Sequence, residues 1–147
     1  MKKTLVILTL SILFTCKNDI PKIHFLKQGF ITEQGEYILS KSKMVIVKRL
    51  ENESFIFAIT DRKRNILYQQ SLVETFSELH YWLLYADDKQ NIYYYNSDYS
   101  SQKALLFDAE KKEYNAIDFC TFEINLPKEF KKKLADDTNL GNCISLR

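Results

Sequence analysis

The sequence predicts a mainly β fold: an antiparallel meander that forms a curled sheet or a small sandwich, with one or two short helices. Its apolar runs are short, are rich in Ile, Val, Phe and Tyr, and are separated by charged or Asn-containing turns, which is typical of strands and hairpins. The intervening turns are about two to six residues long, a length that suits antiparallel neighbours. At 147 residues the chain is long enough for one domain.

Nine strands are expected between residues 23 and 124, each a run of β-branched or aromatic residues. They are Ile23–Ile31, Glu36–Leu39, Met44–Leu50, Ser54–Thr60, Ile66–Gln70, Tyr81–Ala86, Ile92–Asn96, Ala104–Asp108 and Tyr114–Ile124. Segments 61–68 and 87–94 are similar to each other, each an Asp- and Asn-containing turn followed by a Tyr-containing run. We attribute this to the same turn chemistry used twice, because four propeller blades of about 40 residues would exceed the chain.

Two segments show helical patterns instead. Ser71–Glu74 is a capping-box pattern, and apolar residues follow it at helical spacing up to Leu83, so a helix of two or three turns is expected there. This helix overlaps the strand expected at Tyr81–Ala86, and the sequence leaves the choice between helix and strand open. A second short helix is expected over residues 127–135, because it begins with a proline and pairs Phe130 with Leu134.

The first 15 residues have the pattern of a signal peptide. Lys2 and Lys3 are followed by the apolar stretch Thr4–Phe14, which ends at the small residue Thr15 and at Cys16. A helix that spans the bilayer core needs about 20 apolar residues, so this stretch is too short for a durable span. We therefore expect residues 1–15 to be removed during export.

Leu13-Phe14-Thr15-Cys16 resembles the lipobox of bacterial lipoproteins. The resemblance implies that Cys16 carries lipid and becomes the N-terminal residue, that residues 16–22 form a tether, and that residues 23–147 form one β-rich domain. The protein would then be lipid-anchored in the cell envelope, at the outer membrane, facing the periplasm or the exterior, since several acyl chains give stable attachment. The alternative is a plainly cleaved signal peptide, because Thr15 is not the usual residue before such a cysteine.

Cys120 and Cys143 remain as a pair once Cys16 is assigned to lipid. An even number of thiols in an oxidising compartment predicts a disulfide, here one that fastens the C-terminal tail onto the sheet. Two unrelated free thiols are the alternative. No metal or cofactor site is expected, because only His24 and His80 could join the cysteines, and the spacing of a zinc site is missing.

Charge and motifs argue against a nucleic-acid partner and against catalysis. Of 21 basic residues, Lys2 and Lys3 lie in the signal segment, and the 19 that remain equal the 19 acidic ones, so the domain lacks the cationic surplus of a nucleic-acid binder. Nucleophilic catalysis needs a nucleophile, a base and an orienting group, and the two histidines lie in no such pattern. Adjacent acids such as Asp87-Asp88 fit solvated turns. We therefore expect a non-enzymatic protein.

Aromatic residues gather in one stretch of the chain. They are Tyr81, Trp82, Tyr85, Tyr93, Tyr94, Tyr95 and Tyr99. Neighbours on a strand face opposite sides, so Tyr94 points away from Tyr93 and Tyr95, and at least one ring is exposed unless the sheet is covered on both faces. Exposed Tyr and Trp are typical of interfaces, which makes Tyr93, Tyr94, Tyr95, Tyr99 and Trp82 candidate partner-binding residues. The alternative is that Tyr simply suits a half-buried strand.

Together these patterns predict an envelope lipoprotein that binds a protein partner. A signal sequence, a small disulfide-tied domain and no catalytic set are similar to envelope immunity proteins and periplasmic enzyme inhibitors, which implies a toxin or a lytic enzyme as the partner. This is an analogy of architecture and not of motif. The first alternative is a surface lipoprotein that assists glycan or nutrient binding, with the aromatic rings stacked on sugars. A small envelope enzyme is the third possibility.

Overall fold

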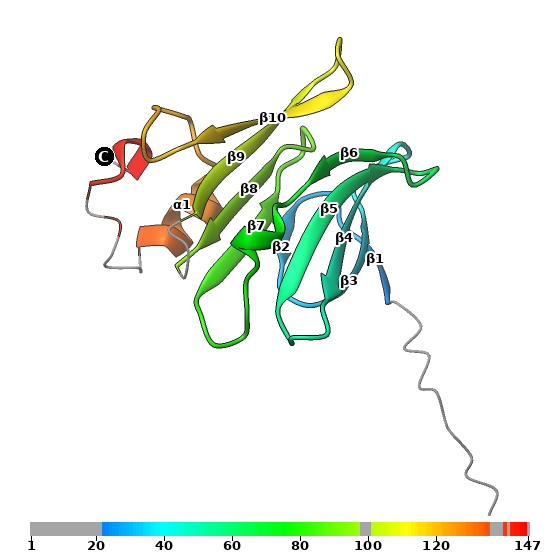
Figure 1. The fold of residues 1–147 in the computed structure, drawn as a ribbon. Helices are drawn as coiled ribbons and strands as arrows, with labels where there is room; N and C mark the ends of the chain where they lie inside the picture. The colour runs from blue at the N-terminus through cyan, green and yellow to red at the C-terminus, as the bar shows by residue number, and fades with distance from the viewer. Residues whose placement is uncertain (1–21, 98–100, 136–139, 141, 147) are drawn as a thin grey trace, which may run out of the picture.

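The computed structural model describes residues 22–97, 101–135, 140 and 142–146. These residues form two five-stranded sheets that pack face to face, with a short helix on the far side of one of them (Figure 1). The strand order is β1-β3-β4-β5-β6 in the first sheet and β10-β9-β8-β7-β2 in the second sheet. The mainly β sandwich predicted from the sequence is therefore confirmed.

Each sheet is a four-stranded antiparallel meander with one N-terminal strand added at its edge. The first sheet contains β1 (Ile23–Phe25), β3 (Gly35–Ile38), β4 (Lys43–Arg49), β5 (Phe55–Asp61) and β6 (Ile66–Gln69). The second sheet contains β2 (Gly29–Ile31), β7 (Trp82–Ala86), β8 (Ile92–Asn96), β9 (Ser101–Asp108) and β10 (Glu113–Asp118). β1 pairs with β3 in parallel, and β2 pairs with β7 antiparallel.

The single strand expected at Ile23–Ile31 is divided between the two sheets. The chain leaves the first sheet after Phe25 and enters the second sheet at Gly29, where φ is 133°. This value lies in a region that side chains disfavour, and glycine adopts it readily. Gly29 therefore allows the chain to change sheets within three residues, which the uninterrupted apolar pattern did not indicate.

The helix expected from Ser71 is reduced to the 3-10 turn η1 (Leu72–Glu74), in which Ser71 caps the backbone N–H of Val73. The rest of that prediction is wrong. Phe76 is buried and forms an isolated antiparallel bridge with Phe55, so tertiary pairing holds the chain extended where its sequence favoured a helix. The second expected helix is confirmed as α1 (Lys128–Ala135).

The second sheet is covered on both faces. One face packs on the first sheet and contributes Leu84 and Tyr94 to the core between the sheets. The other face carries Tyr93 and Tyr95 and packs against α1 and the C-terminal segment, whose buried residues include Phe130, Leu134 and Leu140. The molecule therefore has three layers, and β8 is the central strand of the middle one.

The four hairpin turns that join β3–β4, β5–β6, β7–β8 and β9–β10 meet around one cavity, and we call this end of the sandwich the turn end. The similar segments of the sequence form two of these turns. Oδ1 of Asp61 and Oδ1 of Asp87 each accept hydrogen bonds from the backbone N–H groups two and four residues further on, at 2.8–2.9 Å. Arg64 and Gln90 occupy the same position, with φ of 69° and 68°.

Replacing Tyr93, Tyr94 or Tyr95 by alanine should lower the free energy of unfolding by about 3 to 5 kcal/mol in each case, because each change opens a cavity in a packed layer. Phe25→Ala is the matched control. That ring is exposed, so its loss should change stability by no more than about 0.5 kcal/mol. Urea unfolding followed by circular dichroism measures both effects, and a tyrosine variant as stable as the control would contradict the three-layer packing.

Candidate functional site

The aromatic residues predicted to bind a partner do not form a surface. Tyr93, Tyr94 and Tyr95 are 4%, 1% and 1% exposed, and Trp82 is half-buried against the core between the sheets. The expectation that at least one of the three rings is exposed is wrong, because both faces of the second sheet are covered. Tyr99 lies outside the described residues, as does Cys16.

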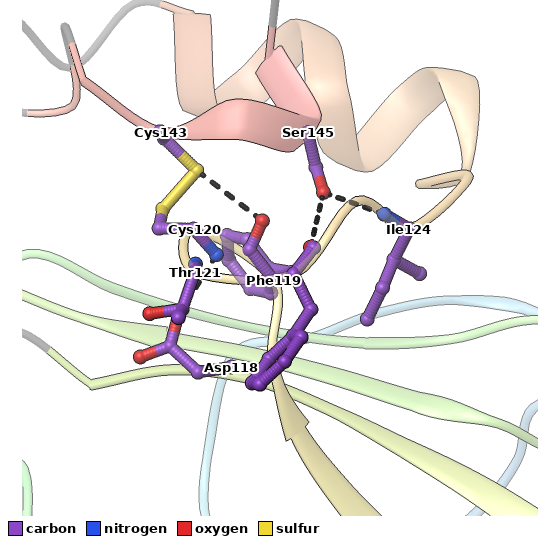
Figure 2. Close-up of a disulfide and its surroundings, with 8 residues drawn as sticks. Asp118, Phe119, Cys120, Thr121, Ile124, Cys143 and Ser145 are labelled. Atoms are coloured by element: carbon purple, nitrogen blue, oxygen red, sulfur yellow. Dashed lines mark hydrogen bonds between the residues drawn. A yellow bond between two sulfur atoms is a disulfide. The ribbon is translucent and has the colours of Figure 1, made fainter.

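The predicted bridge between Cys120 and Cys143 is confirmed, with the two sulfurs 2.00 Å apart (Figure 2). It joins the segment after β10 to the C-terminal segment, which ends in the 3-10 turn η3 (Ile144–Leu146). Next to it, the Ser145 hydroxyl accepts a hydrogen bond from the Ile124 N–H at 2.8 Å and donates one to the Phe122 carbonyl at 3.1 Å. The bridge thus fastens the third layer over the second sheet, as the sequence predicted.

The face of the first sheet that points away from the second sheet has no layer over it within the described residues (Figure 1). Strand alternation and register place one set of side chains on this outer face. They are Ile23, Phe25, Glu36, Ile38, Met44, Ile46, Lys48, Ile56, Ala58, Thr60, Ile66 and Gln69. Most of them are apolar, whereas the open face of an antiparallel sheet is usually polar. This face is therefore the best candidate for a binding surface.

A trough crosses the outer face. It consists of a hollow of about 230 Å³ over β4, β5 and β6 and a wider one of about 740 Å³ over β3 and β4, and both are lined by Ile46 and Lys48. Ile46 and Ile56 are buried in its floor, whereas Ile66, on the edge strand β6, is 64% exposed. The outer trough is defined by Glu36, Ile46, Lys48, Ile56, Thr60, Arg64 and Ile66.

An ion pair spans the outer trough. Arg64 lies in the β5–β6 turn, and its guanidinium reaches Glu36 on β3 through two hydrogen bonds of 2.7 and 2.9 Å. Glu36 is only 6% exposed, and a buried carboxylate is tolerated only when it is paired. The hydrogen bonds and charge of Glu36 raise the pKa of Arg64 further above its ordinary value. Because Arg64 neutralises Glu36, the trough keeps the positive charge of Lys48.

Thr60 adds an unsatisfied polar group to the smaller hollow. Its Oγ1 is buried and has no hydrogen-bond partner within the described part of the chain, and the residue lines the hollow. An unpaired buried hydroxyl costs about 1 to 3 kcal/mol. A ligand that offers a hydrogen-bond acceptor at this position would recover that free energy.

The outer trough combines an apolar floor, one unpaired hydroxyl and a positive charge, which are groups suited to holding a ligand. In the described ranges, no group of three His, Cys, Asp or Glu side chains could hold a metal ion, and no helix there is long and apolar enough to cross a membrane. The sequence carried one signal for this surface. Met44–Val47 and Phe55–Ile59 are continuous apolar runs, which indicates strands with apolar side chains on both faces.

Arg64→Met should lower the free energy of unfolding by about 1.5 to 3 kcal/mol, because it leaves the buried Glu36 carboxylate without its donors. The double variant with Glu36→Gln should lose less than Arg64→Met alone, since the uncompensated charge is then gone. Arg62→Met, an exposed neighbour in the same turn, is the control. Urea unfolding of the wild type, Arg64→Met, Glu36→Gln, the double variant and the control tests the pair, and additive effects of the two substitutions would refute the coupling.

Comparison with known proteins assigns no family. No family model, no curated protein sequence and no solved structure matches this chain.

Proposed function

We propose that the protein is a non-enzymatic, lipid-anchored envelope protein that binds a protein partner through the outer trough. One observation carries this proposal: a sheet face with no layer over it within the described residues, which has a buried apolar floor and is hollowed beside the exposed Ile66. Large apolar patches with polar rims are typical of protein interfaces. The proposal keeps the partner class expected from the sequence, but it places the binding surface on the first sheet and not on β8, the strand that carries Tyr93, Tyr94 and Tyr95.

The lining of the smaller hollow specifies the chemistry of the partner. Its charged lining residues are Lys48 and Arg64, and no acidic side chain lines it. An apolar side chain of the partner would fill the space between Ile56 and Ile66, and a backbone carbonyl would accept a hydrogen bond from Thr60. An acidic group beside these would face Lys48. The partner surface is therefore apolar with an acidic margin.

Toxins and lytic enzymes are the partner class that we favour, by analogy with immunity proteins and enzyme inhibitors of similar architecture. The alternative, glycan or nutrient binding, depended on exposed rings that could stack on sugars. Tyr93, Tyr94 and Tyr95 are buried, so that alternative has lost its main support. Glycan or nutrient binding remains the second hypothesis, and a small envelope enzyme remains the third.

The proposed anchor places the outer trough near the membrane. β1 is the edge strand of the first sheet and follows directly after the tether of residues 16–22. Seven extended residues span at most about 25 Å. A lipid on Cys16 would therefore hold the first sheet within reach of membrane-associated partners.

Cys16→Ser should release the protein from membranes or leave it with its signal segment, because the substitution removes the sulfur that accepts lipid. Membrane fractionation and mass spectrometry of the N-terminal peptide test this. An unmodified N-terminal residue other than Cys16 in the wild-type protein would rule out the anchor and leave secretion alone.

Ile66→Asp should weaken partner binding by about 2 kcal/mol, as at interface hot spots, because a charge replaces an exposed apolar contact. Lys48→Glu should also weaken binding, by reversing the charge that faces the acidic margin. Both side chains are exposed, so the melting temperature should stay nearly constant.

The partner would be crosslinked in the envelope, purified and titrated against each variant. Leu79→Asp is the matched control, because Leu79 is an exposed apolar residue in the loop before β7. Binding that is lost in Ile66→Asp and retained in Leu79→Asp supports the trough. Equal binding by wild type, Ile66→Asp and Lys48→Glu would show that the interface lies elsewhere.

A further inference from the structure

The turn end of the sandwich holds a cavity that shares no lining residue with the outer trough. Its volume is about 520 Å³, which is within the usual range for small-ligand sites. Leu67 and Phe107 give it apolar walls, and three cationic residues, Lys43, Lys89 and Lys112, line it from both sheets. It therefore combines an apolar lining with concentrated positive charge.

Lys43 is the unusual member of this group. It is the first residue of β4 and is only 5% exposed, although lysine is rarely buried without a partner. Its Nζ lies 2.9 Å from the centre of the Phe107 ring and 5.3 Å from that of Tyr114. Ring faces attract cations but do not neutralise them, and no acidic group forms an ion pair with Lys43 in the described part of the chain.

The acid nearest in register does not serve as its counter-ion. Asp61 is the β5 partner of Lys43 and also lines the cavity. Its carboxylate accepts hydrogen bonds from the Lys63 N–H at 2.8 Å, the Asn65 N–H at 2.9 Å and the Asn65 amide at 2.7 Å. The Asp61 carboxylate is therefore occupied by hydrogen bonds within the β5–β6 turn, and the three lysines give the cavity an excess of positive charge.

We propose that this cavity binds a carboxylate carried on a short apolar stem. The carboxylate would pair with Lys43 and face Lys89 and Lys112, while the stem would lie against Phe107 and Leu67. Such a group can come from a free small acid or from an acidic side chain of a protein. This inference goes beyond the trough and does not depend on it.

The protonation of Lys43 gives the site a pH dependence. Burial lowers the pKa of Lys43 to about 8, so the amine is mostly charged at neutral pH. A bound carboxylate favours the charged form, so affinity should be highest below pH 8 and should fall as Lys43 loses its proton above it. The other groups that face it are Asp61, Lys89, Lys112 and Tyr114, and burial raises the pKa of the Tyr114 phenol.

The full-length protein would be titrated with phenylacetate and with neutral phenylacetamide, followed by NMR of the lysine side chains. Phenylacetate should bind at least about tenfold more tightly than the amide, and Lys43→Met should remove most of that difference. Lys132→Met, on the exposed side of α1, is the matched control and should bind like wild type. Equal affinities for acid and amide, or wild-type affinity in Lys43→Met, would overturn the proposal.

Two further measurements complete the test. The double variant Lys89→Gln and Lys112→Gln changes only exposed residues, so it tests the cavity even if Lys43→Met does not fold. It should weaken phenylacetate binding severalfold, and unchanged affinity would count against the site. N-acetylglutamate amide presents a carboxylate as a glutamate side chain of a protein does. If it binds more tightly than phenylacetate, and Lys43→Met abolishes that binding, the site is assigned to an acidic side chain of a protein partner. If it binds more weakly than phenylacetate, the site is assigned to a free small acid.

Discussion

The architecture depends on one constraint: the central strand of the second sheet carries large aromatic side chains on both faces. Tyr94 points to one side, and Tyr93 and Tyr95 point to the other. Neither side can be left in water without exposing a large apolar area, so the sheet needs two coverings. The first sheet supplies one, and α1 with the C-terminal segment supplies the other. Within the described residues, the outer face of the first sheet is then the sheet face that has no layer over it.

Local patterns in the sequence predicted much of this fold. Alternating or continuous apolar runs located most strands to within one or two residues, and the Phe130–Leu134 pair located α1. Features that depend on distant contacts were not predictable. Phe76 is extended because Phe55 pairs with it from another part of the chain. Tyr94 is buried against the first sheet, and Tyr93 and Tyr95 are buried because a helix more than 30 residues later covers them.

In the candidate sites, too, the features that follow from the local sequence were predictable and those that depend on distant contacts were not. The pairing of Cys120 with Cys143 followed from counting thiols, whereas Glu36 and Arg64 are separated by 28 positions and nothing in either local sequence links them. The β5–β6 turn contributes to both sites: Asp61 lines the turn-end cavity, and Arg64 closes the outer trough.

Because of the disulfide, the stability of the third layer depends on whether the surroundings of the protein are reducing or oxidising. In a reducing compartment that layer is held by noncovalent packing, chiefly of Phe130 and Leu134 against the second sheet. Oxidation of Cys120 and Cys143 closes a loop, which in the chain-entropy model raises the free energy of unfolding by roughly 3 kcal/mol. That is a large share of the stability of a domain of this size. The same sequence therefore has a looser, more easily unfolded form before oxidation and a fastened form after it.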